Sequence, residues 1–77
     1  MPKAKFEVGD WVEVQTDKEY GEKWNGFLCV VQKVTSDWLI VQQVAISSHR
    51  YNPAYKGHVA FAVEDLKLLV KKSQIAP

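Results

Sequence analysis

The chain contains two strand-like segments of nine residues that are separated by only two residues. FLCVVQKVT spans residues 27–35 and WLIVQQVAI spans residues 38–46. Both are rich in β-branched and aromatic residues, and the polar pair Ser36-Asp37 between them suits a tight turn. The sequence therefore predicts that these two strands form a β-hairpin.

Three further segments extend this pattern. Residues 11–15, WVEVQ, alternate with a period of two, which places Val12 and Val14 on one face of a strand. Residues 58–63, HVAFAV, alternate in the same way. Residues 64–70, EDLKLLV, are interpreted as one turn of helix followed by a short strand, although their spacing also fits a longer helix. Together the segments predict an all-β fold of five strands.

The second predicted strand is irregular. It carries apolar residues on both faces, so the sequence does not decide which face is buried. Its last apolar residues, Val31 and Val34, are three positions apart instead of two. This spacing indicates a β-bulge or a strong bend, and such a bend lets a small sheet curl.

At 77 residues the chain is predicted to form one domain over residues 6–70, with flexible ends at 1–5 and 71–77. Cys29 is the only cysteine, and no Cys/His cluster has the spacing of a zinc site. We therefore expect no disulfide, no metal and no cofactor. Self-association into a homodimer would bury more apolar surface and is left open.

Net charge bears on whether the partner is a nucleic acid, and the length of the apolar runs bears on whether it is a membrane. The formal net charge is +1 at pH 7, far from the strongly basic balance of domains that depend on phosphate contacts. The longest apolar runs are too short to cross a bilayer, and no signal peptide is visible. We expect a cytoplasmic protein without a membrane partner, whose partner is a protein or, alternatively, DNA or RNA.

Three motifs resemble those of the SH3-like small barrels. FEVGDWVEV, WNGFLCVV and FAVEDLKLL are similar to the F-x-x-G-D-x-V opening, the W/Y-x-G strand start and the acidic-leucine ending of that superfamily. The resemblance covers residues 6–70 and implies an SH3-like five-stranded small barrel, with two long loops and a one-turn helix before the last strand. Similar patterns occur in KOW and Tudor-type modules and in small phage or bacterial proteins, so the likeness is specific for the fold and not for one activity.

Two relatives with definite roles are less similar. Type II dihydrofolate reductase lines its central pore with a Val-Gln-Ile-Tyr motif, whereas the matching positions here are His58, Val59, Ala60 and Phe61. Both the glutamine and the tyrosine are missing, which argues against reductase activity. The SH3-like stromal subunit of photosystem I resembles this chain in its closing strand and long loop, but its basic docking residues have no assigned counterpart.

Aromatic and cationic residues gather in two predicted loops, residues 16–26 and 47–57. In SH3-like barrels these loops often lie near one another, so the resemblance implies one shallow aromatic platform. Aromatic rings among cations suit stacked bases, proline-rich peptides or methylated lysine. The alternative is that the rings form a small core that holds the loops. The candidate binding residues are Trp11, Tyr20, Trp24, His49, Arg50, Tyr51, Tyr55 and Lys56.

Five positions receive structural predictions. Gly9 and Asp10 are expected to form the turn that begins the first strand, and Asp65 to cap or position the helical turn. Trp11 is expected either on the outer face of the barrel or under the terminal segment. Cys29 is expected to be a buried, inert thiol.

These patterns predict a non-enzymatic binding module that docks on a protein partner through its loop aromatics, as a phage or bacterial accessory or regulatory protein would. No catalytic residue is expected, because neither histidine has a nucleophile or paired carboxylate placed with it. The alternative is a KOW/Tudor-like domain that stacks bases and pairs phosphates. A third class, an enzyme whose active site forms between copies, is left open.

Overall fold

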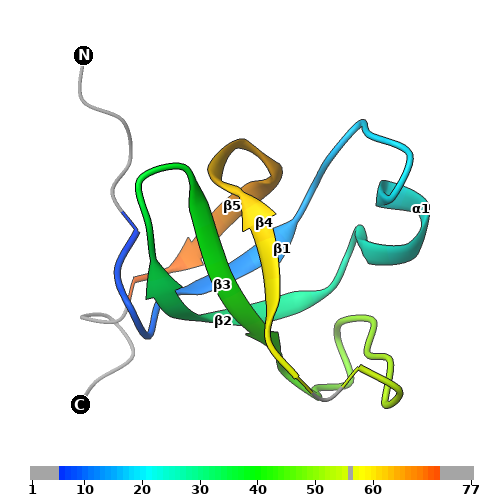
Figure 1. The fold of residues 1–77 in the computed structure, drawn as a ribbon. Helices are drawn as coiled ribbons and strands as arrows, with labels where there is room; N and C mark the ends of the chain where they lie inside the picture. Colours follow the sequence, from blue (N-terminus) through cyan, green and yellow to red (C-terminus); the bar gives the residue numbers. More distant parts are fainter. Residues whose placement is uncertain (1–5, 56, 72–77) are drawn as a thin grey trace.

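The computed structural model describes residues 6–55 and 57–71, in which five antiparallel strands form one sheet (Figure 1). The strand order is β4-β3-β2-β1-β5. The strands are β1 (Trp11–Val14), β2 (Leu28–Val34), β3 (Trp38–Gln43), β4 (Val59–Ala62) and β5 (Leu66–Val70). The predicted all-β class with five strands is confirmed.

Two short helical turns interrupt the strands. The turn α1 (Gly21–Trp24) lies between β1 and β2, in a segment that the sequence predicts to be a loop. The 3-10 turn η1 (Val63–Asp65) connects β4 to β5, as predicted, and the alternative of a longer helix over this segment is wrong. Neither turn is long and apolar enough to span a membrane, and the same holds for every helix of the described residues.

The predicted hairpin is formed by β2 and β3, with Val34 opposite Leu39 next to the turn. The register shifts between Val31 and Lys33, which confirms the predicted bulge. Val31 is buried, whereas Val34, beyond the bulge, is exposed. Val34 lies opposite the buried Leu39, so the bulge brings Val34 to the same face as Val31, and Val34 is exposed beside the turn.

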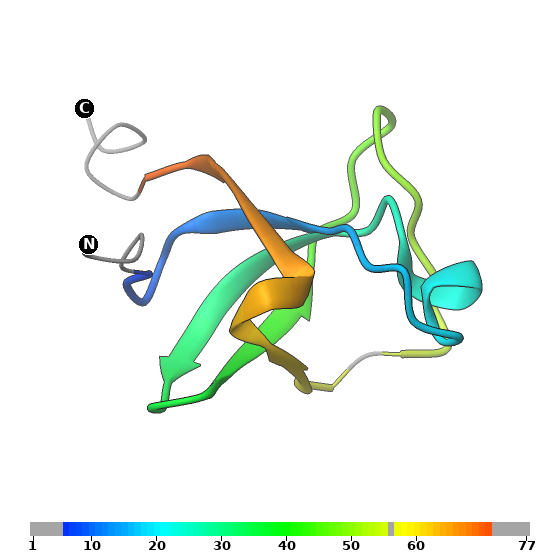
Figure 2. The same ribbon diagram turned by 90° about the horizontal axis from the view of Figure 1, so that it is seen from above.

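The sheet is curled, as Figure 2 shows, and its buried apolar side chains form one core. Val12 and Val14 are buried on the face that their alternation predicts. In β2, Cys29 and Val31 belong to this core, and Leu28, which alternates with them, is also buried. The core comprises Val12, Val14, Phe27, Cys29, Val31, Leu39, Val41, Phe61 and Leu66. Because the sheet is open between β4 and β5, these two strands form its edges.

The predicted turn at Gly9 and Asp10 is confirmed. Gly9 has φ 98°, a conformation that favours glycine, and its N–H donates to Val31 O at 2.8 Å. The fully buried Asp10 carboxylate accepts hydrogen bonds from the Glu7 N–H (2.8 Å) and from Lys71 Nζ (3.0 Å). The bond to Asp10 raises the pKa of Lys71. Asp10 thus joins the start of the domain to residue 71.

Flexible ends are predicted at residues 1–5 and 71–77. Residues 1–5 and 72–77 lie outside the described residues, so the flexibility of the two ends stays a prediction.

Candidate functional site

Two loops lie side by side at one end of the sheet, on the right in Figure 1. We call residues 15–27 the first loop and residues 44–58 the second loop. Phe27 and Arg50 form a short parallel bridge between them, and the Arg50 N–H donates to Gly26 O at 3.3 Å. The proximity that the resemblance implies is therefore present.

Arg50 fastens the second loop to the first. Its Nη1 donates to Asn25 O at 2.9 Å and to Glu22 O at 3.3 Å. The guanidinium carbon lies 5.3 Å from the centroid of the Phe27 ring, in the range of a cation-π contact. The side chain that the sequence offers as a phosphate ligand is thus engaged in holding the two loops together.

Trp24 is the centre of the aromatic contacts. Its ring packs edge-on against Phe27 and Phe61, with centroids 5.0 Å and 5.5 Å away, and tilted against Tyr55 at 4.7 Å. Trp24 is partly buried and packs against the main core. For Trp24, the alternative of a small loop core describes the contacts better than an open platform.

An aromatic pocket of about 240 Å³ lies beside Trp24. Its lining includes the buried Phe61 of β4 and two exposed rings, Tyr20 and Trp38, whose exposed fractions are 36% and 51%. We use the name aromatic pocket for the depression lined by Lys18, Tyr20, Trp24, Trp38, Val59, Ala60 and Phe61. Two predicted residues, Tyr20 and Trp24, therefore meet in it.

Trp38 was missed by the sequence analysis. It begins β3 and pairs with Ala62 of β4, so it belongs to the sheet and not to either loop. A signal was present: Leu39 and Val41 alternate with Trp38 and Ile40, which places Trp38 on the face opposite the core. An indole on the outer face of a strand is a candidate contact residue.

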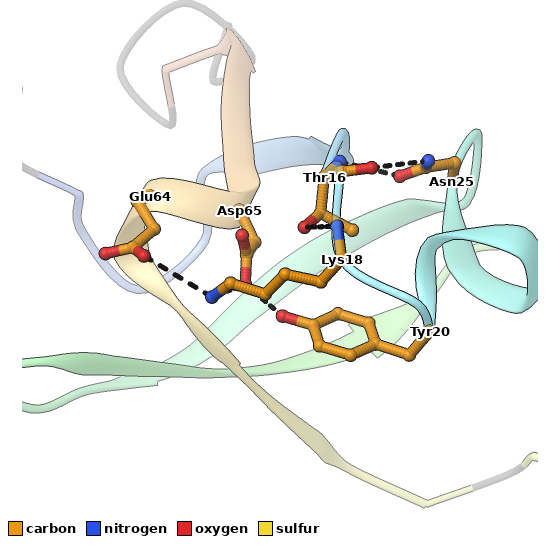
Figure 3. A network of polar contacts seen from close by, with 6 residues as sticks. All are labelled: Thr16, Lys18, Tyr20, Asn25, Glu64 and Asp65. Atoms are coloured by element: carbon orange, nitrogen blue, oxygen red, sulfur yellow. Dashed lines mark hydrogen bonds and ion pairs between the residues drawn. The ribbon is translucent and has the colours of Figure 1, made fainter.

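Polar contacts hold Tyr20 at the pocket (Figure 3). The Tyr20 hydroxyl donates to the Asp65 carboxylate, and Lys18 Nζ reaches Asp65 Oδ2 at 3.0 Å and Glu64 Oε2 at 3.3 Å. Burial by itself would raise the pKa of Asp65, but the hydrogen bonds from Tyr20 and Lys18 outweigh it and lower that pKa. The hydrogen bond between Tyr20 and Asp65 raises the pKa of Tyr20. The hydrogen bond between Lys18 and Asp65 likewise raises the pKa of Lys18.

Asp65 is therefore a positioning residue, but it does not cap η1. The N-cap position of η1 is Ala62, and no side chain caps it. The prediction of a capping role is wrong because the carboxylate turns toward the first loop. Through its hydrogen bonds to Tyr20 and Lys18, the Asp65 carboxylate holds the first loop against the start of β5.

A second set of contacts closes the base of the first loop. The Asn25 side chain accepts from the Thr16 N–H at 2.7 Å and donates to Thr16 O at 2.8 Å, as Figure 3 shows. Gly21 is buried against this pair, and a Cβ there would lie 2.7 Å from Asn25 Nδ2 and 2.8 Å from Thr16 O. Only a residue without a side chain leaves room for the pair.

The remaining candidates lie away from the aromatic pocket. Trp11 is partly buried in β1 between Val30 and Val70, its cross-strand partners. His49 Nε2 lies 3.1 Å from Glu13 Oε2. Tyr51 is exposed and does not line the pocket. Tyr55 does not line the pocket either, but its ring packs against that of Trp24, which does.

Lys56, the last of the predicted binding residues, lies outside the described residues.

Two acidic depressions lie near the pocket and share Glu64 with each other. One of about 270 Å³ shares Lys18 with it and is also lined by Asp17, Glu64 and Asp65. The other, of about 260 Å³, is lined by Ser36, Asp37, Val63 and Glu64. This row of carboxylates extends from Asp65 beside Lys18 to Asp37, which directly precedes Trp38 in the sequence.

Thiol reactivity and metal binding can both be assessed from the described residues. Burial raises the pKa of the Cys29 thiol to about 12, so it is no nucleophile at neutral pH. Within residues 6–55 and 57–71, no three His, Cys, Asp or Glu side chains are grouped so that they could hold a metal ion. What the geometry offers is a surface for contact: an apolar pocket with carboxylates beside it.

Comparison with protein-family models, curated proteins and solved structures found no match to this chain. The resemblance to SH3-like barrels therefore stays a prediction.

Proposed function

We propose that this protein is a non-enzymatic binding module that docks on a protein partner through the aromatic pocket. The observation that supports the proposal is the exposed pair Trp38 and Tyr20 over the buried Phe61. Large rings at the mouth of an apolar pocket provide contact area at low entropic cost, and such residues dominate the binding energy of many interfaces.

A protein partner fits the charges better than a nucleic acid does. Arg50 is bound to the carbonyls of the first loop, and Lys18 is paired with Asp65 and Glu64. Two carboxylates lie near the pocket: Glu64 is paired with Lys18 of its lining, and Asp37 directly precedes Trp38. A phosphate backbone would be repelled by such a surface. The resemblance to small phage and bacterial proteins adds the context of a cytoplasmic accessory or regulatory role.

The proposal is tested by selecting ligands from a displayed library of random dodecapeptides. Selected peptides are titrated into the ¹⁵N-labelled protein, and we expect amide shifts at Tyr20, Trp24, Trp38 and Phe61. Trp38→Ala should weaken binding at least about tenfold, because truncating an interface tryptophan commonly costs more than 1 kcal/mol. Trp38 is half exposed, so its loss should leave the thermal midpoint nearly unchanged.

Tyr51→Ala is the matched control, because Tyr51 is an exposed aromatic residue that does not line the pocket. Its affinity should stay within about twofold of the parent. Short single- and double-stranded DNA and RNA are titrated in parallel at low and moderate salt. Binding to these alone, with affinity that falls steeply with salt, would replace the proposal by the nucleic-acid alternative.

A further inference from the structure

Strand β4 forms an open edge of the sheet directly beside the aromatic pocket. Among the described strands its only neighbour is β3, which pairs with it from Trp38↔Ala62 to Val41↔Val59. Exposed strand edges present unpaired backbone groups that another chain can use. This edge is short, and it carries small side chains at Ala60 and Ala62.

The direction of the backbone groups of β4 follows from one hydrogen bond. The Val63 N–H donates to Asp37 O at 3.3 Å, so it points toward the side of β3. Backbone groups alternate along an antiparallel strand, so Phe61 also faces β3 whereas Ala60 and Ala62 face away. Ala60 therefore presents both its N–H and its C=O to the open edge. Ala62 presents its N–H.

The pocket and the edge form one continuous surface. Val59, Ala60 and Phe61 of β4 line the aromatic pocket together with Trp38, which pairs with Ala62 in the sheet. A chain that hydrogen-bonds to Ala60 would pass over the pocket mouth. Because side chains alternate along a strand, every second side chain of that chain would point toward the pocket.

The charges beside this surface indicate the composition of the bound segment. The described residues lining the two acidic depressions include four carboxylates and one ammonium. The ammonium, Lys18 Nζ, is already paired with Asp65 and Glu64. The side chain of Glu64 remains 75% exposed. A cationic side chain that follows an apolar one would meet this carboxylate and Asp37.

We propose that the occupant is an extended segment of a protein partner that adds to β4 as a sixth strand. One apolar side chain fills the aromatic pocket, and a Lys or Arg of the same segment pairs with Glu64 and Asp37. This inference rests on the proposed function, since it names how the partner binds to the same pocket.

The first test uses the dodecapeptides selected from the random library. We expect the selected sequences to share an apolar residue with Lys or Arg one to three positions away, and to lack proline at the central positions. Each backbone amide of one such peptide is then N-methylated in turn. Loss of affinity of at least about tenfold at alternate positions is expected for strand addition, because every second amide faces β4.

Variants of the protein test the other side of the contact. Ala60→Pro removes the outward N–H without removing a donor from the β3–β4 ladder, and it should weaken the peptide at least about tenfold. If this variant does not fold, the N-methyl series decides the question by itself. Glu64→Gln and Asp37→Asn should each weaken binding about threefold, as rim charges do. Glu7→Gln, a carboxylate paired with Lys71 away from the pocket, is the control.

The possible outcomes separate this inference from the proposed function. If no peptide is selected, or if Trp38→Ala leaves binding unchanged, the proposed function fails and this inference fails with it. If pocket-binding peptides are proline-rich or acidic, or if N-methylation has no alternating effect, only strand addition is overturned. Sedimentation that shows a stable homodimer which Ala60→Pro dissociates would also overturn it, because a second copy would then pair with β4.

Discussion

The hydroxyl of Tyr20 donates a hydrogen bond to the carboxylate of Asp65, which lies 45 residues later in the chain. Tyr20 belongs to the first loop, and Asp65 ends η1 just before β5. Asp65 is only 3% exposed, and Lys18 provides a second bond to it. The loop that lines the aromatic pocket is thus held by a buried carboxylate.

Tyr20→Phe should lower the free energy of unfolding by about 1 to 3 kcal/mol, because a hydrogen bond to a buried charge is lost. Urea unfolding monitored by tryptophan fluorescence measures the change. Tyr51→Phe is the control: Tyr51 is exposed, so its unfolding free energy should stay within about 0.5 kcal/mol of the parent. Equal effects of the two substitutions would contradict the anchoring role of Tyr20.

Asp65 should make stability depend on pH in the acid range. Its pKa lies below the ordinary 3.8 in the folded protein, so the folded state favours the ionised form. The contribution is present above that value and is lost as the pH falls through the lowered pKa of the folded state. Urea unfolding of the parent and Asp65→Asn between pH 7 and pH 2 should give a difference that is largest at neutral pH. A difference that does not shrink in acid would contradict the assignment.

Gly21→Ala should destabilise the protein, although alanine usually favours helices by up to about 1 kcal/mol over glycine. The new Cβ would lie 2.7 Å from Asn25 Nδ2 and 2.8 Å from Thr16 O, so the hydrogen-bonded pair of Asn25 and Thr16 must move apart. We expect a loss of about 1 to 3 kcal/mol in thermal or urea unfolding. Gly57→Ala is the matched control, because a Cβ there meets nothing within 4 Å. A stabilised Gly21→Ala variant would show that Asn25 and Thr16 make room for the methyl group without loss of stability.

Cys29 should react with a thiol reagent only when the protein unfolds. The side chain is buried and its pKa is raised to about 12, so very little thiolate exists at pH 8. The initial rate with a disulfide reagent at pH 8 should be on the order of 1,000-fold lower without denaturant than in guanidinium chloride. Fast labelling of the folded protein would mean that β2 opens readily.

The strands could be predicted because their signals are local. The alternation around Val12 and Val14, the Ser36-Asp37 turn and the spacing of Val31 and Val34 each lie within a few residues. The structure confirms the strands, the hairpin and the bulge that these signals predict. A single turn such as α1 was missed because four residues in a polar loop carry no apolar repeat.

The sequence by itself thus determined the all-β class, the hairpin and the presence of aromatic residues in the two loops. Only the tertiary structure decided what those residues do. Arg50 meets Asn25 across 25 residues, and Tyr20 meets Asp65 across 45, so no local pattern records either contact. Trp38 joins the aromatic pocket because β3 pairs with β4, which brings it beside Phe61. The physical reason is that the curl of the sheet sets which distant side chains meet, whereas periodicity sets only which face each of them occupies.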